Sequence, residues 1–222
     1  MAAPATLLNS SVGKKIVMAI TGIVLSLYVL GHMAGNLQAF LKNGPEALDH
    51  YGAFLHEMLH GAGIWFVRGG LLLAIILHVW AYLSLTQKSL AARPKGYRVN
   101  DFEEATFASR SMRWTGPILA AFIVFHLMHL TIGNVHSHFV EGRVYQNVIT
   151  GFASVPVALF YILAMGCLAF HLWHGAWSML QTLGLSHPKY LAARKAFAVV
   201  FTVLVTGGFV LVPLAVLAGI LK

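Results

Sequence analysis

The sequence predicts an all-α membrane protein in which five transmembrane helices form a single domain over residues 1–222. Hydrophobic residues make up 58% of the chain and charged residues only 10%, whereas a soluble domain carries about 25% charged residues. Long stretches without Asp, Glu, Lys or Arg recur along the chain, and histidines lie inside four of the five. So few charges cannot cover a globular surface, which excludes a soluble enzyme, a nucleic-acid-binding domain and a disordered chain.

These uncharged stretches set the expected spans, because a bilayer-spanning helix needs roughly 20 apolar residues. One stretch, 144–188, exceeds a single span. Its polar start is interpreted as a loop, and Pro156 to Leu183 as a helix that Gly184 and Pro188 end. The first apolar run is too long for a cleavable signal peptide and is expected to be the first span. The predicted spans are residues 16–41, 64–87, 114–135, 156–183 and 196–221.

The basic residues predict which way the spans run. Eleven Lys and Arg fall on one side of the spans and four on the other, and the positive-inside rule places the richer side, with the N-terminus, in the cytoplasm. The longest cytoplasmic loop, 88–112, contains Asp101, Glu103 and Glu104 and is either a docking place for a peripheral partner or a plain solvated loop. The richer side holds Lys14, Lys15, Lys88, Arg93, Lys95, Arg98, Arg110, Arg113, Lys189, Arg194 and Lys195, and the other side Lys42, Arg68, Arg143 and Lys222.

A weak internal repeat picks out one histidine in each of four spans. The first and third spans carry M-x-x-T-G followed by a histidine ten residues after the glycine, and the second and fourth carry His-x-Trp followed by Ser and Gln. Duplicated units of this kind are typical of membrane proteins. The first copy is Met18, Thr21, Gly22, His32, His78, Trp80, Ser84 and Gln87, and the second is Met112, Thr115, Gly116, His126, His171, Trp173, Ser178 and Gln181.

The depths of the four selected histidines pair them across the bundle. With a rise of about 1.5 Å per residue, His32 and His126 lie toward the outer surface, and His78 and His171 toward the inner one. Two imidazoles at matched depth on facing helices can hold one haem iron from both sides. A single histidine within a span is more often an interhelical hydrogen-bonding residue, but six histidines on four spans favour ligands.

Two further histidines, His129 and His174, each follow a selected histidine by three residues and share its helical face. Depth alone fits His129 to the outer pair slightly better, but the repeat favours His126. We predict that His129 and His174 donate hydrogen bonds to haem propionates instead of binding iron. Zinc and copper fit poorly because they need three or four converging ligands, and no Asp, Glu or second Cys lies in the spans.

Cysteine and glycine narrow the choice of cofactor further. Cys167 is the only cysteine, which excludes an internal disulfide, a CxxC zinc site, a c-type haem attachment and an iron–sulfur cluster held by this chain alone. The glycines near the histidines have two interpretations: they let a flat macrocycle approach the backbone, or they allow close helix packing. These glycines are Gly31, Gly35, Gly166 and Gly175.

Together these motifs resemble the single-chain, five-helix, di-haem cytochrome b subunit of succinate dehydrogenase and fumarate reductase. The resemblance covers residues 10–221 and implies that His32 and His126 bind a distal b haem and that His78 and His171 bind a proximal one. Ala169 departs from the family, because some members carry a glutamate there that is used in proton transfer. The matching motifs are Thr21-Gly22 to Gly31-His32-Met33, Leu77-His78, Thr115-Gly116 to Phe125-His126-Leu127, and Phe170-His171 through Gly175, Trp177 and Ser178 to Gly184.

The resemblance also implies partners and a substrate. An iron–sulfur subunit and a flavoprotein subunit would lie on the cytoplasmic side of a bacterial cytoplasmic membrane. Dicarboxylate chemistry would take place in them, since this chain has no flavin or nucleotide motif. A lipid quinone, generally menaquinone, would react near the distal haem.

The outer loop 42–64 is interpreted either as part of the quinone site or as a solvated amphipathic helix at the membrane surface. His and Glu side chains can exchange protons near neutral pH, as quinone chemistry requires. The candidates in this loop are His50, Tyr51, His56, Glu57 and His60. His136 and His138 in the second outer loop have the same two interpretations.

Two other classes of membrane protein are alternatives. The di-haem subunit of respiratory nitrate reductase also has five helices, but it concentrates its ligands on two of them. A haem-free membrane anchor or a transporter is the second alternative. Basic residues around the cytoplasmic opening orient the spans, and a docking role for the iron–sulfur partner or a contact with propionates is a further hypothesis. They are Arg110, Arg113, Lys189, Arg194 and Lys195.

Overall fold

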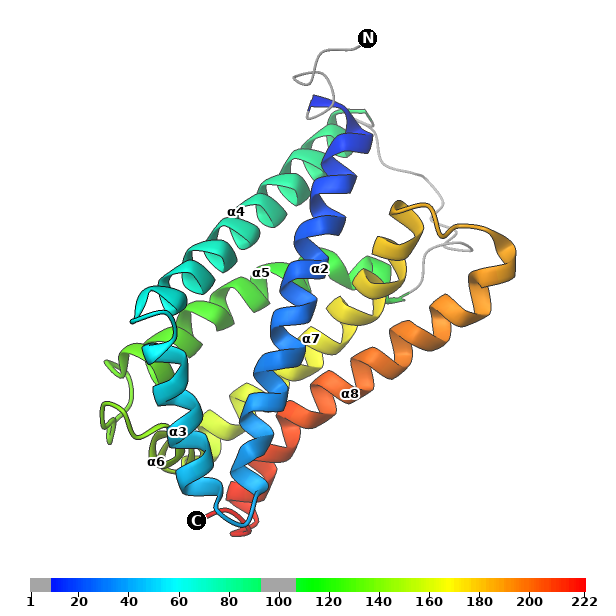
Figure 1. Cartoon of the computed structure of the whole chain (residues 1–222). Helices are drawn as coiled ribbons and strands as arrows, with labels where there is room; N and C mark the ends of the chain where they lie inside the picture. Colours follow the sequence, from blue (N-terminus) through cyan, green and yellow to red (C-terminus); the bar gives the residue numbers. More distant parts are fainter. Residues whose placement is uncertain (1–8, 93–106) are drawn as a thin grey trace.

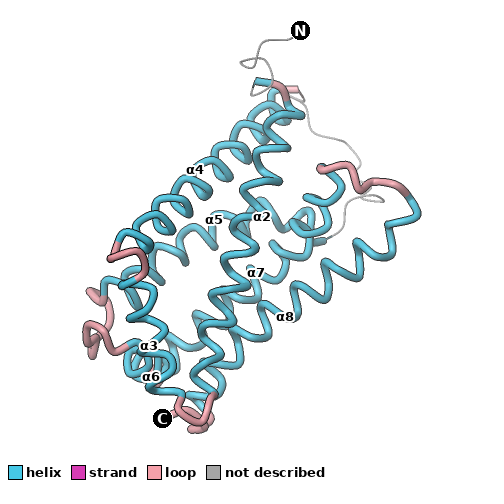
Figure 2. Tube along the Cα trace, in the orientation of Figure 1, coloured by secondary structure: helices cyan, strands magenta, loops and turns pink. Residues whose placement is uncertain are grey.

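The computed structural model describes residues 9–92 and 107–222, and within these ranges the regular structure is entirely helical. Five helices are long and apolar enough to cross a membrane, which confirms the predicted fold class. Figure 2 shows them as one bundle of long antiparallel helices. They are α2 (Ser11–Asn36), α4 (Ala62–Ala91), α5 (Phe107–Leu127), α7 (Val155–Thr182) and α8 (Leu191–Leu217).

Shorter elements continue or connect the long helices. A 3₁₀ turn, Leu37–Phe40, extends α2, and a π-helical turn, Met128–Ile132, extends α5. Two short helices, α3 (Gly44–Glu57) and α6 (Val144–Phe152), lie between long ones, and a 3₁₀ turn, Pro188–Tyr190, precedes α8. Of these, α3 matches the interpretation of the outer loop 42–64 as an amphipathic helix.

Four of the long helices, α2, α4, α5 and α8, extend past the predicted spans on the side richer in Lys and Arg, whereas α7 matches its predicted span to within one residue. The helix α2 begins at Ser11 because the Ser10 hydroxyl caps it, accepting a hydrogen bond of 2.9 Å from the Gly13 N–H. Lys14 and Lys15 are therefore helical, although they lie outside the uncharged stretch. Charged residues bound the apolar part of a helix without ending its hydrogen-bond ladder, so charge gaps underestimate helix length.

The helix α6 was not predicted, because residues 144–155 were interpreted as a loop. Its apolar residues Val144, Tyr145, Val148, Ile149 and Phe152 recur at helical spacing and pack against the buried core. The helix N-terminus is held by the carboxylate of Asp49 on α3, which accepts a hydrogen bond of 2.8 Å from the Tyr145 N–H. This contact joins α3 to α6 across a gap of 96 residues in the chain.

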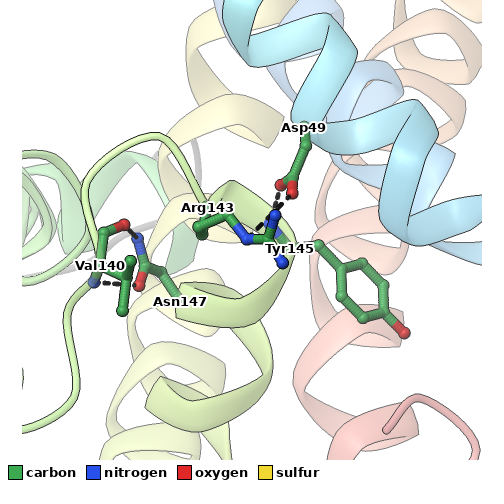
Figure 3. A network of polar contacts seen from close by, with 5 residues as sticks. All are labelled: Asp49, Val140, Arg143, Tyr145 and Asn147. Carbon is green, nitrogen blue, oxygen red and sulfur yellow. Dashed lines mark hydrogen bonds and ion pairs between the residues drawn. The ribbon is translucent and has the colours of Figure 1, made fainter.

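Figure 3 shows this contact within a small polar network. The Arg143 Nε lies 3.9 Å from a carboxylate oxygen of Asp49. The Asn147 side chain makes two hydrogen bonds of 2.8 Å with the Val140 backbone, one as donor and one as acceptor. The connection between α5 and α6 is thereby fixed at the end of the bundle that carries α3.

The two ends of the bundle differ in character. The start of α2 and the C-terminus of the chain lie at opposite ends of the bundle, with α3 and α6 beside the C-terminus (Figure 1). We call the end that carries α3 and α6 the capped end. The other, the basic end, is defined by Lys14, Lys15, Lys88, Arg110, Arg113, Lys189, Arg194 and Lys195. Residues 93–106, which include Arg93, Lys95, Arg98, Asp101, Glu103 and Glu104, lie outside the described residues.

The packing of the long helices follows the sequence repeat. α2 packs along α4, and α5 packs along α7, so each copy of the repeat forms one antiparallel helix pair. α2 and α7 join the two pairs, and α8 packs against α7 and α2. Large apolar side chains cover the outside of the helices, among them Trp65 and Phe66 at 68% and 75% exposure, as a lipid-facing surface requires.

Candidate functional site

Four histidines from four helices meet in two pairs inside the bundle. The ring centres of His32 on α2 and His126 on α5 are 5.8 Å apart, and the rings are inclined by 74°. The ring centres of His78 on α4 and His171 on α7 are 6.2 Å apart, inclined by 52°. The structure thus brings together the four histidines selected by the repeat, in the combination that their depths indicate.

The donor chemistry of each pair fits a haem iron. Metal–imidazole bonds of about 2.0–2.1 Å on opposite sides of one metal place the two ring centres about 6 Å apart, close to the separations of both pairs. Nowhere in residues 9–92 and 107–222 do three His, Cys, Asp or Glu side chains gather as metal ligands. Two nitrogen donors leave a zinc ion incomplete, but they could serve as the protein ligands of a haem iron, whose macrocycle would provide the other ligands.

The inner pair is oriented by a threonine. The Thr21 hydroxyl donates to the Val17 carbonyl at 2.8 Å, and its oxygen lies 3.0 Å from the Nδ1 of His78. A hydroxyl has one proton, so with that proton directed to the carbonyl, the Thr21 oxygen accepts a hydrogen bond from Nδ1–H. The Nε2 of His78 is then left with its lone pair free to bind a metal.

The second copy of the repeat arranges the same residues differently. A Cβ at Gly22 would lie 3.6 Å from the Cε1 of His78, and a Cβ at Gly116 would lie 4.0 Å from the Cε1 of His171. Each T-G dipeptide therefore lies against the histidine of its own helix pair. Thr115, however, donates to the Ser111 carbonyl at 2.9 Å, and the Nδ1 of His171 is buried without a hydrogen-bond partner in the described chain.

The outer pair lies among aromatic rings. Tyr28 stacks on His32 with ring centres 5.6 Å apart, and Phe209 of α8 approaches the same histidine at 5.6 Å. Phe122 stacks on His126 at 5.9 Å. These rings limit the orientations that the two imidazoles can take.

Tyr161 of α7 links the outer pair to His129. Its hydroxyl oxygen lies 3.3 Å from the Nδ1 of His126 and 3.0 Å from the Nδ1 of His129. The sequence analysis missed Tyr161, although a tyrosine inside an uncharged span, ten residues before a selected histidine, is a signal that could have found it.

His129 is buried, at 3% exposure, and belongs to a cluster of polar groups near the capped end. Its ring stacks on His136 with centres 4.8 Å apart, and the Nε2 of His136 donates to the Asn147 carbonyl at 2.9 Å. Gly151 of α6 closes over both rings, because a Cβ there would lie 2.8 Å from the His129 Cε1 and 3.0 Å from the His136 Nε2. The Nδ1 of His129 already has the Tyr161 hydroxyl as a partner. The contact predicted between His129 and a haem propionate stays a prediction.

The quinone candidates of the first outer loop are spread over α3 and the turn that follows it. Only Tyr51 is half-buried: its ring packs on Gly35, where a Cβ would lie 2.6 Å from the tyrosine Cε1. Gly35 therefore serves close packing, whereas a Cβ at Gly31, Gly166 or Gly175 would meet open space. The exposed candidates are His50, His56, Glu57 and His60, and His138 is exposed as well.

A cavity of about 250 Å³ lies between α2, α4 and α5 at the basic end. Met18 and Met112, the first residues of the two repeated motifs, both line it. Tyr82, one helical turn from His78, and Arg113 supply polar groups, together with Thr86, Ser89 and Ser109.

A bundle of five apolar helices with facing histidines between them defines a multi-pass membrane protein with paired polar side chains in its interior. Residues 87–211 match the model of the succinate dehydrogenase/fumarate reductase transmembrane subunit family, and the chain belongs to that family. It is the membrane-anchor subunit of such a complex, and its partners are the catalytic subunits. No curated protein and no solved structure matches the chain.

The family match covers the second copy of the repeat, with His126 and His171, and most of α8. His32 and His78 lie outside the matched residues, and the repeat and the ring contacts connect them to His126 and His171. Membership favours the succinate dehydrogenase/fumarate reductase assignment over the nitrate-reductase type and over a transporter.

Proposed function

We propose that the chain is a di-haem cytochrome b, which carries electrons between the iron–sulfur subunit and a membrane quinone. The outer haem would be held by His32 and His126, and the inner haem by His78 and His171. The observation that carries this proposal is the meeting of four histidines from four helices in two facing pairs. Within a bacterial cytoplasmic membrane, the basic end would face the cytoplasm and the catalytic subunits.

Bound b haems would supply one-electron transfer along the bundle. The chain's own residues set the conditions for that chemistry. Thr21 fixes the tautomer of His78, and Tyr161 hydrogen-bonds to His126 on the side away from a metal. Arg113 and the hydroxyl groups of the basic-end cavity would bind propionate oxygens of the inner haem.

The quinone, menaquinone in this proposal, would react at the capped end beside the outer pair. Tyr51 is the best placed of the candidates, since it packs on α2 one turn from His32. The other candidates are exposed and would exchange protons with the aqueous phase. They are His50, His56, Glu57 and His60. Ala169 has no ionisable group, so the proposal includes no transmembrane proton path through that position.

Haem quantification of the purified chain tests the proposal. Pyridine haemochrome analysis is expected to give two b-type haems per chain, with a b-type α-band in the reduced-minus-oxidised spectrum. One haem would leave a single functional pair, and no haem would make the chain a haem-free anchor. Either result contradicts the di-haem proposal while leaving family membership intact.

A further inference from the structure

Arg194 lies in the first turn of α8, at the basic end, and is buried at 6% exposure. Its Nε and Nη1 atoms are shielded from solvent and have no hydrogen-bond partner in the described chain. The guanidinium lies over the ring of Trp177 on α7, 5.7 Å from the ring centre. The Nε1 of Trp177 is also buried, with no hydrogen-bond partner among the described residues. Two side chains in contact therefore present unpaired, buried N–H groups.

A buried guanidinium without a counter-ion is costly, because it loses its hydration and no negatively charged group compensates for that loss. The cation–π contact with Trp177 offsets only part of that loss. None of the described acidic residues is a counter-ion for Arg194, because they belong to α3 and the outer loops at the capped end. They are Glu46, Asp49, Glu57 and Glu141. The arrangement requires an acceptor from outside the described chain.

The chemistry of that acceptor follows from the donors. Guanidinium and indole groups donate hydrogen bonds and accept none, and a positive charge combined with N–H donors selects an oxygen anion. We infer that Arg194 and Trp177 form an oxyanion site, which takes a phosphate or carboxylate group between α7 and α8.

The position of the site in the bundle indicates two sources of the phosphate or carboxylate group. Trp177 lies five residues before the end of α7, and exposed Lys189 and Lys195 flank Arg194. This is the depth at which basic pockets between transmembrane helices receive phospholipid headgroups. In the other direction, the ring of His174 lies 6.4 Å from Trp177, one turn from His171. A carboxylate from that side would be a propionate of the inner haem, and this source alone rests on the proposed function.

The test compares Arg194→Gln and Trp177→Phe with the wild type, and with Lys195→Gln as a control for an exposed neighbouring cation. The full-length chain, purified with and without haem, is titrated with phosphatidylglycerol and with a glycolipid that lacks phosphate. Native mass spectrometry counts the bound lipids, and potentiometric titration measures both haem midpoints. Arg194→Lys, which keeps the charge, guards against a folding defect.

If phosphate occupies the site, Arg194→Gln loses one tightly bound phosphatidylglycerol, with or without haem. Trp177→Phe would then weaken that binding severalfold, and the glycolipid would not compete. If a propionate occupies the site, lipid binding is unchanged and the inner-haem midpoint falls in Arg194→Gln, because loss of a nearby positive charge favours the oxidised haem. Lys195→Gln should behave as wild type in both measurements.

Three results would overturn the inference. Arg194→Gln could match wild type in lipid count and in both midpoints. It could alter only the retention of the catalytic subunits, which would make Arg194 part of a protein interface. A combined Asp101→Asn, Glu103→Gln and Glu104→Gln variant could reproduce the Arg194→Gln effect, which would make the acceptor internal to the chain. A wild-type chain without haem would refute the proposed function and leave the phosphate arm fully testable.

Discussion

The hydroxyl oxygen of Thr21 lies 3.0 Å from the Nδ1 of His78 and joins the two helices of the first repeat copy. The same hydroxyl donates to the Val17 carbonyl. With its proton directed there, the hydroxyl oxygen accepts a hydrogen bond from the Nδ1–H of His78. If His78 binds a haem iron, as proposed, Thr21 acts on the basicity and orientation of that ligand, not on the strength of the helix contact alone.

Replacing Thr21 with valine keeps the shape of the side chain and removes the hydroxyl. Because partners that orient ligands change metal affinity by about 10–100-fold, we expect Thr21→Val to release the inner haem roughly tenfold faster and to shift its midpoint. The outer haem should be unchanged. Thr115→Val is the matched control, since Thr115 occupies the equivalent position and its hydroxyl donates to the Ser111 carbonyl instead of contacting a histidine of the described residues. Equal effects of the two substitutions would mean that helix packing, not the His78 contact, is responsible.

The pairing of the histidines predicts which substitutions act alike. His78→Ala and His171→Ala should each remove the inner haem, and His32→Ala and His126→Ala the outer one, so every variant retains one haem. Haem content with potentiometric titration distinguishes the two losses. His138→Ala, at an exposed position, should retain both haems. Retention of the outer haem in His126→Ala and its loss in His129→Ala would exchange the roles of these two residues.

Tyr161→Phe separates hydrogen bonding from packing at the outer pair. The phenyl ring keeps the contacts with Phe122 and Phe152, whose ring centres lie 5.0 and 4.9 Å away, while both histidine contacts of the hydroxyl are lost. We expect two haems to remain and the midpoint of the outer haem to shift. The inner-haem midpoint is an internal reference in the same titration. An unaltered outer midpoint would leave Tyr161 with a structural role only.

Gly151→Ala tests the closeness of α6 to the histidine cluster. The added Cβ would overlap the rings of His129 and His136, so the packed cluster must shift, and overpacking of this kind costs about 1–3 kcal/mol. Thermal unfolding in detergent should show a lower midpoint. Gly69→Ala on α4 is the control, because nothing lies within 4 Å of its Cβ position. A midpoint equal to that of Gly69→Ala would show that α6 can move aside.

The sequence predicted the parts of this fold that depend on hydropathy and on residue spacing. Span positions follow from the absence of charge, and the repeat selects four histidines because each copy builds the same helix pair. The helix α6 could not be found this way, because an uncharged run does not separate a short amphipathic helix from the span that follows.

The surroundings of the histidines were predicted less well. A regular helix places His129 on the face of His126, but the π-helical turn at Met128–Ile132 changes the local geometry, and Tyr161 from another helix bridges the two residues. The burial of Arg194 depends on where α8 packs on α7, which no local pattern encodes. Contacts between helices far apart in the sequence therefore account for most of what the sequence missed.

The exposed cations of the basic end lead to a prediction about assembly. Arg110 and Lys189 are exposed and belong to the face where the catalytic subunits would dock, and complementary charge between partners favours association at low salt. Arg110→Glu combined with Lys189→Glu should reverse that complementarity and release the catalytic subunits during purification, most completely at low ionic strength. Haem content and membrane insertion should persist, because both residues are exposed at the basic end and neither is one of the paired histidines. Lys42→Glu, an exposed reversal at the capped end, should leave the complex intact. If the double variant co-purifies with its partners as well as Lys42→Glu does, these cations act only in orienting the spans.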